Sequence, residues 1–291
     1  MNYNKLFSGI GLSPEGVEIF NAYHSRIADK SFKEKVIEAY GAFKQGNGAF
    51  SEYALSFAKQ EGVPAEQLLL YLHLVFSEAA YKELQLLGIE EKYFYSSLYD
   101  LEGKCAHNKE EHGIYGIPVD HIPWFRYAMI ATIFTLGRLQ FQIAKSEYDV
   151  EIDGVSIKKG DTCYFVHVPA GGPLTEQACL ESYKRALEFF GKYYGVENMM
   201  CFCYSWLLQP WIDDVLKPDT NIIKFKSTFR LIETVESIPH TFNFIFPKQY
   251  ESLEDYPTDN ALRQAAVDRR RKGELVGYGV GVRLINKDTL A

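Results

Sequence analysis

The stretch HVPAGGPLT, residues 167–175, has residue types that can bind an anion through backbone groups alone. An apolar segment before it predicts a strand, and apolar residues after it have the spacing of an amphipathic helix. A glycine turn that enters a helix leaves N–H groups without partners, which favours phosphate or carboxylate. Because the stretch is short and has no Lys or Arg, a plain strand-to-helix turn is the alternative. The candidate ligand-binding residues are Ala170, Gly171, Gly172, Leu174 and Thr175, with Thr175 as the helix cap.

Two side chains near this turn could transfer protons. His167 lies near the end of the strand predicted over CYFVHV. Tyr204 or Ser205 could offer a hydroxyl at the end of a buried strand predicted within MMCFCYSWLL. A lone histidine is also common as a hydrogen-bonded core residue, so a structural role for His167 stays open. Ser205, His167 and Asp213 have the residue types of a Ser-His-Asp catalytic triad, but no G-x-S-x-G motif supports this, and we set it aside.

Three further motifs have residue types that bind ligands in other proteins. Gly277, Gly279 and Gly281 recur at every second residue, so a predicted strand would have one bare face that packs against a neighbour or a ligand. The basic run at residues 269–272 lies at a predicted helix C-terminus and is either a solvated face or a phosphate contact. The segment CAHNKEEHG at 105–113 matches no zinc spacing, so we expect a surface segment and no metal site.

The composition limits the classes of partner. The net charge of −7 argues against nucleic acid and against an anionic membrane surface as partners. The chain has no run of about 18 apolar residues and no signal-peptide pattern at its start. Its five cysteines show no disulfide framework, which together with these features predicts the reducing cytoplasm. The oligomeric state is left open.

Hydrophobic periodicity changes part-way along the chain and predicts two domains, 1–120 and 121–291. The first domain has helical spacing throughout, with Ser13-Pro14 opening a helix and a single helix expected over 89–113. The second is expected to be α+β, with a largely antiparallel mixed sheet flanked by helices.

Within the second domain the patterns predict a helix over 122–136, a hairpin at Asp153-Gly154 and a helix over 175–193. Alternation predicts strands over 221–236 and 240–247. A helix is expected over 258–273, capped by Thr258 or Asp259 and ended by Gly273, followed by a strand over LVGYGVGVRL.

Several short motifs in a fixed order resemble a bacterial family of acyltransferase-domain proteins. They are LGRLQF, KKGDTCYFVHVPAGGPLTEQACLESYKRALEFF, CYSWLL, LKPDTNIIKF and the closing glycine-rich strand. The family combines a helical N-acyltransferase-like N-terminal domain with a GNAT-like C-terminal domain, and the resemblance is carried by residues 120–285.

The resemblance implies transfer of an acyl group from acyl-CoA, as cosubstrate, to a small-molecule amine, with His167 as base and Tyr204 as acid. It places the CoA diphosphate on the backbone of residues 170–175. The chain departs from the superfamily pattern Q/R-x-x-G-x-G/A because it has no Gln or Arg before the glycines, and Pro173 removes one N–H. Members of the family often have His where this chain has Tyr204. These departures favour the alternative, a non-catalytic GNAT-like protein that senses a ligand or binds a partner.

Overall fold

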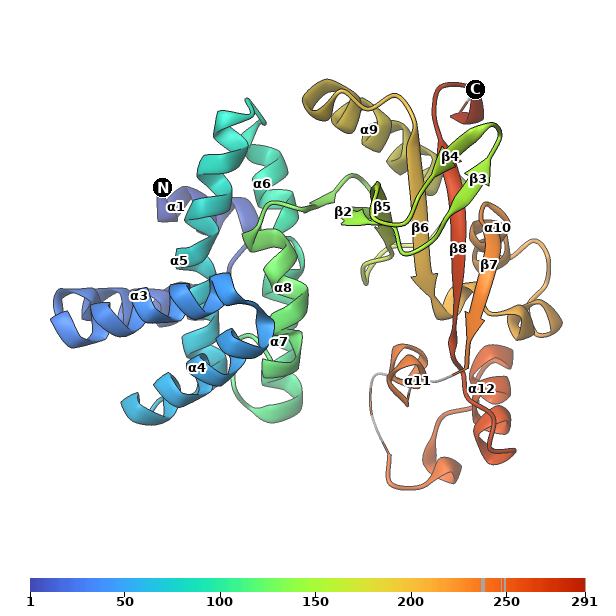
Figure 1. The fold of residues 1–291 in the computed structure, drawn as a ribbon. Helices are drawn as coiled ribbons and strands as arrows, with labels where there is room; N and C mark the ends of the chain where they lie inside the picture. The colour runs from blue at the N-terminus through green and yellow to red at the C-terminus, as the bar shows by residue number, and fades with distance from the viewer. Residues whose placement is uncertain (237–238, 247, 249, 291) are drawn as a thin grey trace. The chain divides into compact units, whose positions relative to one another are not determined.

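The chain forms two compact units, Met1–Thr135 and Leu136–Ala291 (Figure 1). The structure is a computed structural model that describes residues 1–236, 239–246, 248 and 250–290, with the side chains of 239–241 left out. The first unit is helical up to its last residues, whereas the second contains the sheet. The expected boundary at 120/121 differs from this division because the helix at 122–129 belongs to the first unit.

The first unit is built around one long buried helix, α5, which packs against α2, α4, α6 and α8. Ser13 caps α2 by accepting a hydrogen bond from the N–H of Gly16 at 3.3 Å, and Pro14 takes the first helical position, as predicted. The single helix expected over 89–113 is wrong, because the chain turns at Leu98 between α6 and α7. The elements are α1 Tyr3–Ile10, α2 Pro14–Ser25, α3 Lys30–Gln45, α4 Asn47–Glu61, α5 Ala65–Leu86, α6 Glu91–Ser97, α7 Asp100–His112, α8 Ile122–Met129 and β1 Ile133–Thr135.

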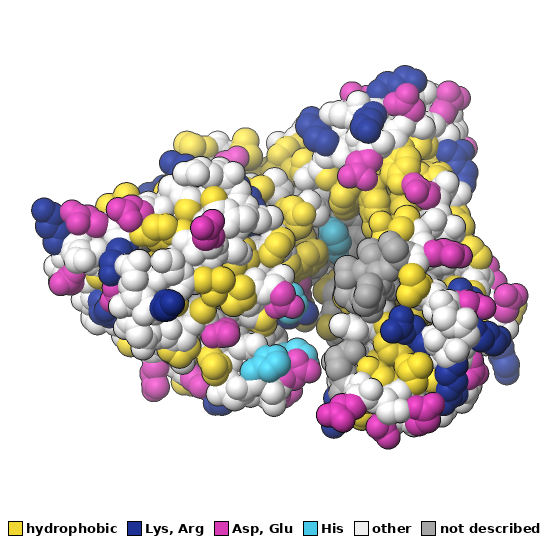
Figure 2. All heavy atoms as spheres, turned by 60° about the horizontal axis from the view of Figure 1, so that its bottom comes forward, with side chains coloured by type: hydrophobic (Ala, Val, Ile, Leu, Met, Phe, Trp, Pro, Cys, Tyr) yellow, Lys and Arg dark blue, Asp and Glu magenta, His cyan; other side chains and the backbone are white. Residues whose placement is uncertain are grey.

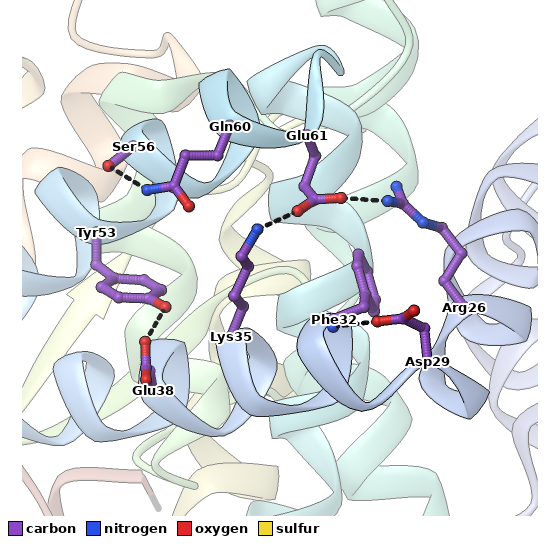
Figure 3. A network of polar contacts seen from close by, with 9 residues as sticks. All are labelled: Arg26, Asp29, Phe32, Lys35, Glu38, Tyr53, Ser56, Gln60 and Glu61. Atoms are coloured by element: carbon purple, nitrogen blue, oxygen red, sulfur yellow. Dashed lines mark hydrogen bonds and ion pairs between the residues drawn. The ribbon is translucent and has the colours of Figure 1, made fainter.

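A carboxylate between two cations connects α4, α3 and the residue after α2 in the first unit. Figure 3 shows Glu61, the last residue of α4, between Lys35 of α3 and Arg26, with both bases bonded to it. The Arg26 guanidinium lies 4.4 Å from the centroid of the Phe32 ring, and Asp29 caps α3 through the N–H of Phe32. The Glu61 side chain is only 13% exposed, so its charge depends on these two partners.

The second unit has a mixed sheet whose strands follow the order β2, β5, β6, β8, β7. β5 and β6 are parallel, whereas β2 with β5, β6 with β8 and β7 with β8 are antiparallel. This confirms the predicted fold class. The elements are β2 Gln140–Lys145, β3 Val150–Ile152, β4 Val155–Ile157, β5 Thr162–His167, α9 Glu176–Tyr194, β6 Met199–Ser205, α10 Asn221–Ser227, β7 Arg230–Val235, α11 Pro239–Ile245, α12 Ala261–Arg271 and β8 Tyr278–Ile285.

The two faces of this sheet are covered differently. The helix α9 packs on one face, where the rings of Tyr164 and Phe190 have centroids 4.5 Å apart. The hairpin of β3 and β4 covers the other face, and its Ile157 shares a buried cluster with Phe202 and Val282. Asp153 and Gly154 form the predicted turn of this hairpin with φ values of 49° and 77°.

Two strand predictions and one helix prediction were wrong in part. The segment predicted as one strand over 221–236 contains the helix α10, capped at Thr220, before the strand β7 begins. The segment 240–247 is helical through Ile245, because Phe242, Ile245 and Phe246 enter one buried cluster at helical spacing; Pro247 lies outside the described residues. The helix expected over 122–136 ends at Met129, and the positive φ of 54° at Ala131 leads into β1.

The helix α12 ends where predicted but begins at a different cap. The side chain of Asn260 accepts from the N–H of Arg263, so Asn260 is the cap rather than Thr258 or Asp259. Its last turn carries Arg269, Arg270 and Arg271, and Gly273 follows with φ of 76°.

Charged side chains of both signs lie together on the surface seen in Figure 2, in a chain with 31 basic and 38 acidic residues. Among the described residues, none of the helices has the length and apolar character needed to cross a membrane.

Candidate functional site

The loop between β5 and α9 is exposed, and its conformation requires glycine at one position. Gly171 has φ of +102°, which L side chains rarely adopt, whereas Gly172 lies outside that region. A Cβ atom built on Gly171 would meet open space, so no atom lies within 4 Å on that side of the Gly171 backbone. Ala170, Gly171 and Gly172 are all exposed. The loop therefore faces outward rather than into the core.

The backbone of this loop offers several N–H donors. Thr175 caps α9, and its Oγ1 accepts from the N–H of Ala178 at 3.2 Å, as predicted. Within the part of the chain that the structure describes, no protein acceptor takes the N–H groups of Ala170, Gly171, Gly172 or Leu174. Donors of this kind beside a helix N-terminus suit an anion.

Arg138 contacts this loop from a distant part of the sequence. Its Nε donates to the carbonyl oxygen of Gly172 at 3.0 Å, and its two terminal nitrogens donate to Pro169 at 2.9 Å and Gly171 at 3.1 Å. The loop sequence did not indicate this residue, because Arg138 lies 34 residues before Gly172 in the chain. The available signal was the motif LGRLQF, which contains Arg138.

Arg138 is held in place by α9. The hydroxyl of Ser182 accepts from the N–H of Arg138 at 2.7 Å and of Leu139 at 3.3 Å, and it donates to the Ala178 carbonyl at 2.8 Å. Gly137, with φ of +94°, allows this approach, because a Cβ there would lie 2.8 Å from the Ser182 hydroxyl oxygen. The start of α9 and the residues before β2 thus form one hydrogen-bonded assembly.

His167 and Tyr204 lie on the same face of the sheet, at the ends of the parallel strands. Phe165 of β5 is paired with Phe202 of β6, and His167 and Tyr204 each follow two residues later. Because side chains alternate along a strand, these residues share the face that the β3–β4 hairpin covers. The structure therefore places the two predicted proton carriers on neighbouring strands.

His167 is half-buried and hydrogen-bonded. Its Nε2 lies 2.9 Å from Oε1 of Gln142 on β2, so the proton of the neutral ring resides on Nε2. Burial lowers the pKa of His167 from 6.5 to about 4. The imidazole is neutral at physiological pH and can accept a proton there, but its low pKa makes it a weak base.

Tyr204 is half-buried, and a carboxylate lies beside its hydroxyl. The hydroxyl donates to Oε2 of Glu147 at 3.3 Å, and the ring centroid is 4.9 Å from that of Phe165. Burial, and secondarily the charge of Glu147, raises the pKa of Tyr204 well above its usual value. The phenol therefore keeps its proton at neutral pH. Glu147 is a second residue that sequence reasoning missed, because 57 residues separate it from Tyr204.

A second tyrosine–carboxylate pair lies nearby. The Tyr148 hydroxyl donates to Oε2 of Glu233 on β7 at 2.5 Å, and the Tyr148 ring stacks on Phe202 with centroids 6.0 Å apart. Burial and the Glu233 carboxylate raise the pKa of Tyr148. Two exposed carboxylates, Glu147 and Glu233, thus accompany aromatic hydroxyls on this side of the sheet.

The first turn of α9 has its own ion pair. Glu176 Oε2 lies 3.6 Å from Nζ of Lys224 on α10, and both side chains are substantially exposed. A carboxylate at a helix N-terminus is favoured by the helix dipole, but it also repels any anion that binds there.

The other motifs have structural roles. Gly279 and Gly281 face Leu208, which would lie within 2.9 Å of an added Cβ, whereas Gly277 precedes β8 with φ of +60°. Lys226 Nζ lies 2.6 Å from Asp213, beside a cavity of about 220 Å³. Gly281 and Asp213 line this cavity, whereas His167, Tyr204 and residues 170–175 do not. In the basic run, Arg269 pairs with Glu274 and Arg271 with Asp268, the carboxylates lying 3.0 Å away in both pairs. The hydroxyl of Ser205 bonds the N–H of Leu207.

The segment at 105–113 lies mostly within α7, and its Cys105 is buried. In the described ranges no group of three or more His, Cys, Asp or Glu side chains is placed to hold a metal ion. All five cysteines are free and buried, and burial raises the pKa of each thiol.

Comparison with protein families assigns both units. Residues 1–129 match the N-acyltransferase N-terminal domain, and residues 133–283 match the GNAT-like C-terminal domain. The chain belongs to the family with this GNAT-like C-terminal domain. The match contains the loop, both parallel strands and the face that carries His167 and Tyr204, so the candidate site lies in the GNAT-like domain. No curated protein matches the chain.

Solved structures show the same fold. An acyltransferase in complex with CoA and 10C-teicoplanin is 23% identical, with 78% of this chain and 68% of that chain covered at a TM-score of 0.65. An acyltransferase variant in complex with octanoyl-CoA is 19% identical, with 97% and 87% covered at a TM-score of 0.70. At these identities the likeness establishes the arrangement of the chain.

Proposed function

We propose that the protein transfers an acyl group from acyl-CoA to an amine, and that its GNAT-like domain holds the site. The observation that carries the proposal is the exposed loop after β5, whose N–H groups lie beside the N-terminus of α9. Membership in the family supports it. The structurally similar acyltransferases bound to CoA, octanoyl-CoA and decanoyl-CoA support it further.

In this proposal the CoA diphosphate binds the loop and the thioester lies between the ends of the parallel strands. The N–H groups of Ala170, Gly171, Gly172 and Leu174 donate to the phosphate oxygens, and the helix dipole of α9 adds a favourable field. Beyond the paired residues Phe165 and Phe202, the ends of β5 and β6 lead to His167 and Tyr204. The reacting carbonyl is thus placed where both proton carriers can approach.

The reaction is direct transfer. The ammonium group of the acceptor first loses one proton to solvent. The neutral nitrogen then attacks the thioester carbonyl, its second proton passes to the neutral imidazole of His167, and the C–S bond breaks as the amide forms. The leaving thiolate takes a proton from the Tyr204 hydroxyl, and the pair returns to its starting state by proton exchange with solvent. Backbone N–H groups stabilise the oxyanion that develops at the carbonyl. Both residues have the protonation state that this step requires.

The acceptor is a small molecule with a cationic amine in its resting form. Glu147 lies at the Tyr204 hydroxyl and Glu233 at the Tyr148 hydroxyl, so two carboxylates and two aromatic rings line the approach to this face. Carboxylates and tyrosine faces both attract ammonium groups. The buried free thiols favour the cytoplasm as the compartment.

An assay of free thiol release tests this function. The protein is incubated with acetyl-, octanoyl- or decanoyl-CoA and a panel of amines, and the release of CoA thiol is recorded. We expect release that depends on the amine and that falls in His167→Asn and Tyr204→Phe by about 10²-fold or more.

The control is Gly172→Asp, which puts a carboxylate where the diphosphate would bind. Acyl-CoA that binds the wild type without any amine-dependent release would favour the alternative, a non-catalytic protein that senses the ligand. Equal release by wild type and Gly172→Asp would contradict the proposed site.

A further inference from the structure

Three hydrogen bonds from Arg138 fix the orientation of two amides in the loop after β5. In a trans peptide the C=O and the following N–H point in opposite directions, and every described peptide bond is trans. The carbonyl oxygens of Pro169 and Gly171 point at the Arg138 guanidinium. The N–H groups of Ala170 and Gly172 therefore point away from it.

The third bond has a different consequence. The carbonyl of Gly172 precedes Pro173, whose nitrogen has no hydrogen. The bond from Arg138 to this carbonyl at 3.0 Å therefore does not orient an N–H group. It holds Gly172, the last glycine before α9, and directs its partly negative carbonyl oxygen toward the Arg138 guanidinium. Carbonyl oxygens that turned to the opposite face would repel a phosphate there.

A guanidinium suits this task better than an ammonium. It is planar, always charged and has donors in a fixed fork, so it can bond three carbonyl groups of one loop at once. Its own backbone is held by the Ser182 hydroxyl on α9, which connects the loop to the helix it precedes.

We propose that Arg138 is a positioning residue for the acyl-CoA diphosphate. It holds the N–H groups of Ala170 and Gly172 toward the phosphates and binds the loop carbonyls instead of the phosphates. The inference rests on the proposed function, and it explains how a loop without its own Gln or Arg forms an anion site. The basic residue comes from the segment before β2.

Calorimetric titration tests this role with two ligands that differ in the diphosphate. Decanoyl-CoA has it, whereas S-decanoyl-pantetheine lacks it. We expect Arg138→Ala and Arg138→Lys both to weaken decanoyl-CoA binding by at least about tenfold, because neither can bond three carbonyls in this geometry. Binding of S-decanoyl-pantetheine should change by less than about twofold. Arg185→Ala, at an exposed position on α9, is the matched control and should bind as the wild type does.

The outcomes separate the inference from the function. Arg138→Lys binding decanoyl-CoA like the wild type while Arg138→Ala does not would show that charge alone matters and would overturn the positioning role. If the Arg138 variants lose equal affinity for both ligands, or unfold at a temperature far below that of the wild type, Arg138 stabilises the fold in general and the positioning role is overturned. A wild type that binds neither ligand at millimolar concentration would overturn the proposed function itself.

Discussion

Nε of Arg138 donates a hydrogen bond to the carbonyl oxygen of Gly172 at 3.0 Å, although 34 residues separate them in the chain. This contact joins the segment before β2 to the loop before α9. It supplies the basic side chain that the loop sequence itself lacks. The proposed anion site is therefore assembled by the fold rather than by a local motif.

Replacing Gly171 by alanine should destabilise the protein, because φ at this residue is +102°. An L residue in that region costs about 1–3 kcal/mol of unfolding free energy. Urea denaturation measures it, with Gly172→Ala as the control, since φ there lies outside the left-handed region and the nearest atom is 4.0 Å from an added Cβ. Equal unfolding free energies for the two variants would contradict the loop conformation described.

Replacing Glu176 by glutamine should strengthen CoA binding. The carboxylate lies in the first turn of α9, where it would repel a diphosphate bound at the loop, and it lies 3.6 Å from Nζ of Lys224. Removing one negative charge from the first turn of a helix changes the binding free energy of an anion there by about 0.3–1 kcal/mol, or roughly two- to fivefold in affinity. The gain should shrink at high salt. Glu188→Gln, an exposed change further along α9, should leave the affinity unaltered; the same gain there would point to net charge alone.

Replacing Glu147 by glutamine should weaken recognition of a cationic acceptor. Its carboxylate lies 3.3 Å from the Tyr204 hydroxyl and is exposed, so the loss should raise KM for the amine by about two- to tenfold. The affinity for CoA should not change. Steady-state kinetics at saturating acyl-CoA measure this. A lower CoA affinity with unchanged KM for the amine would show that Glu147 contributes to CoA binding and would contradict a role in recognising the amine.

Replacing Glu61 by glutamine should lower the unfolding free energy by about 1–2 kcal/mol, because Lys35 and Arg26 lose their shared partner. Glu34→Gln is the control, since Glu34 and Lys30 form an exposed pair that should contribute less than about 0.5 kcal/mol. Similar losses for both variants would contradict a special role for the network in Figure 3.

The stabilisation that Glu61 contributes should also depend on pH. Lys35 and then Arg26 hold the pKa of Glu61 below its usual 4.5, so the unfolded state binds the proton first as pH falls. The stabilisation is therefore complete above pH of about 5 and is lost at lower pH. Urea denaturation from pH 3 to 7 should show wild type and Glu61→Gln converging at acid pH. A constant difference across this range would contradict it.

Periodicity and capping residues predicted most elements but failed where short apolar runs fit two structures. The run at 221–227 alternates like a strand, yet Thr220 starts a helix there and Phe225 packs on Phe229 with ring centroids 5.2 Å apart. The spacing of Phe242 and Phe246 fits a strand as well as a helix. The segment is helical because both rings pack in one buried cluster. Tertiary packing resolves such segments, and the sequence alone does not contain it.

The loop residues and the cap at Thr175 were predictable because strand, glycine turn and helix are adjacent in the chain. His167 and Tyr204 were selected as strand-end residues, and the parallel pairing of β5 and β6 brings them to one face. Arg138 and Glu147 come from other segments, so their contacts with the site depend on the sheet order. The loop has no Gln or Arg before its glycines, but Arg138 provides a basic side chain there, so this departure argues less strongly against acyl-CoA binding.

The most direct test of the account is a crystal structure of the protein with bound octanoyl-CoA. We predict that diphosphate oxygens accept hydrogen bonds from the N–H groups of Ala170 and Gly172, at about 2.7–3.2 Å. The Arg138 bonds to the loop carbonyls should persist, and the thioester should lie between His167 and Tyr204. Octanoyl-CoA bound at another surface, with the loop amides facing only solvent, would contradict the central claim.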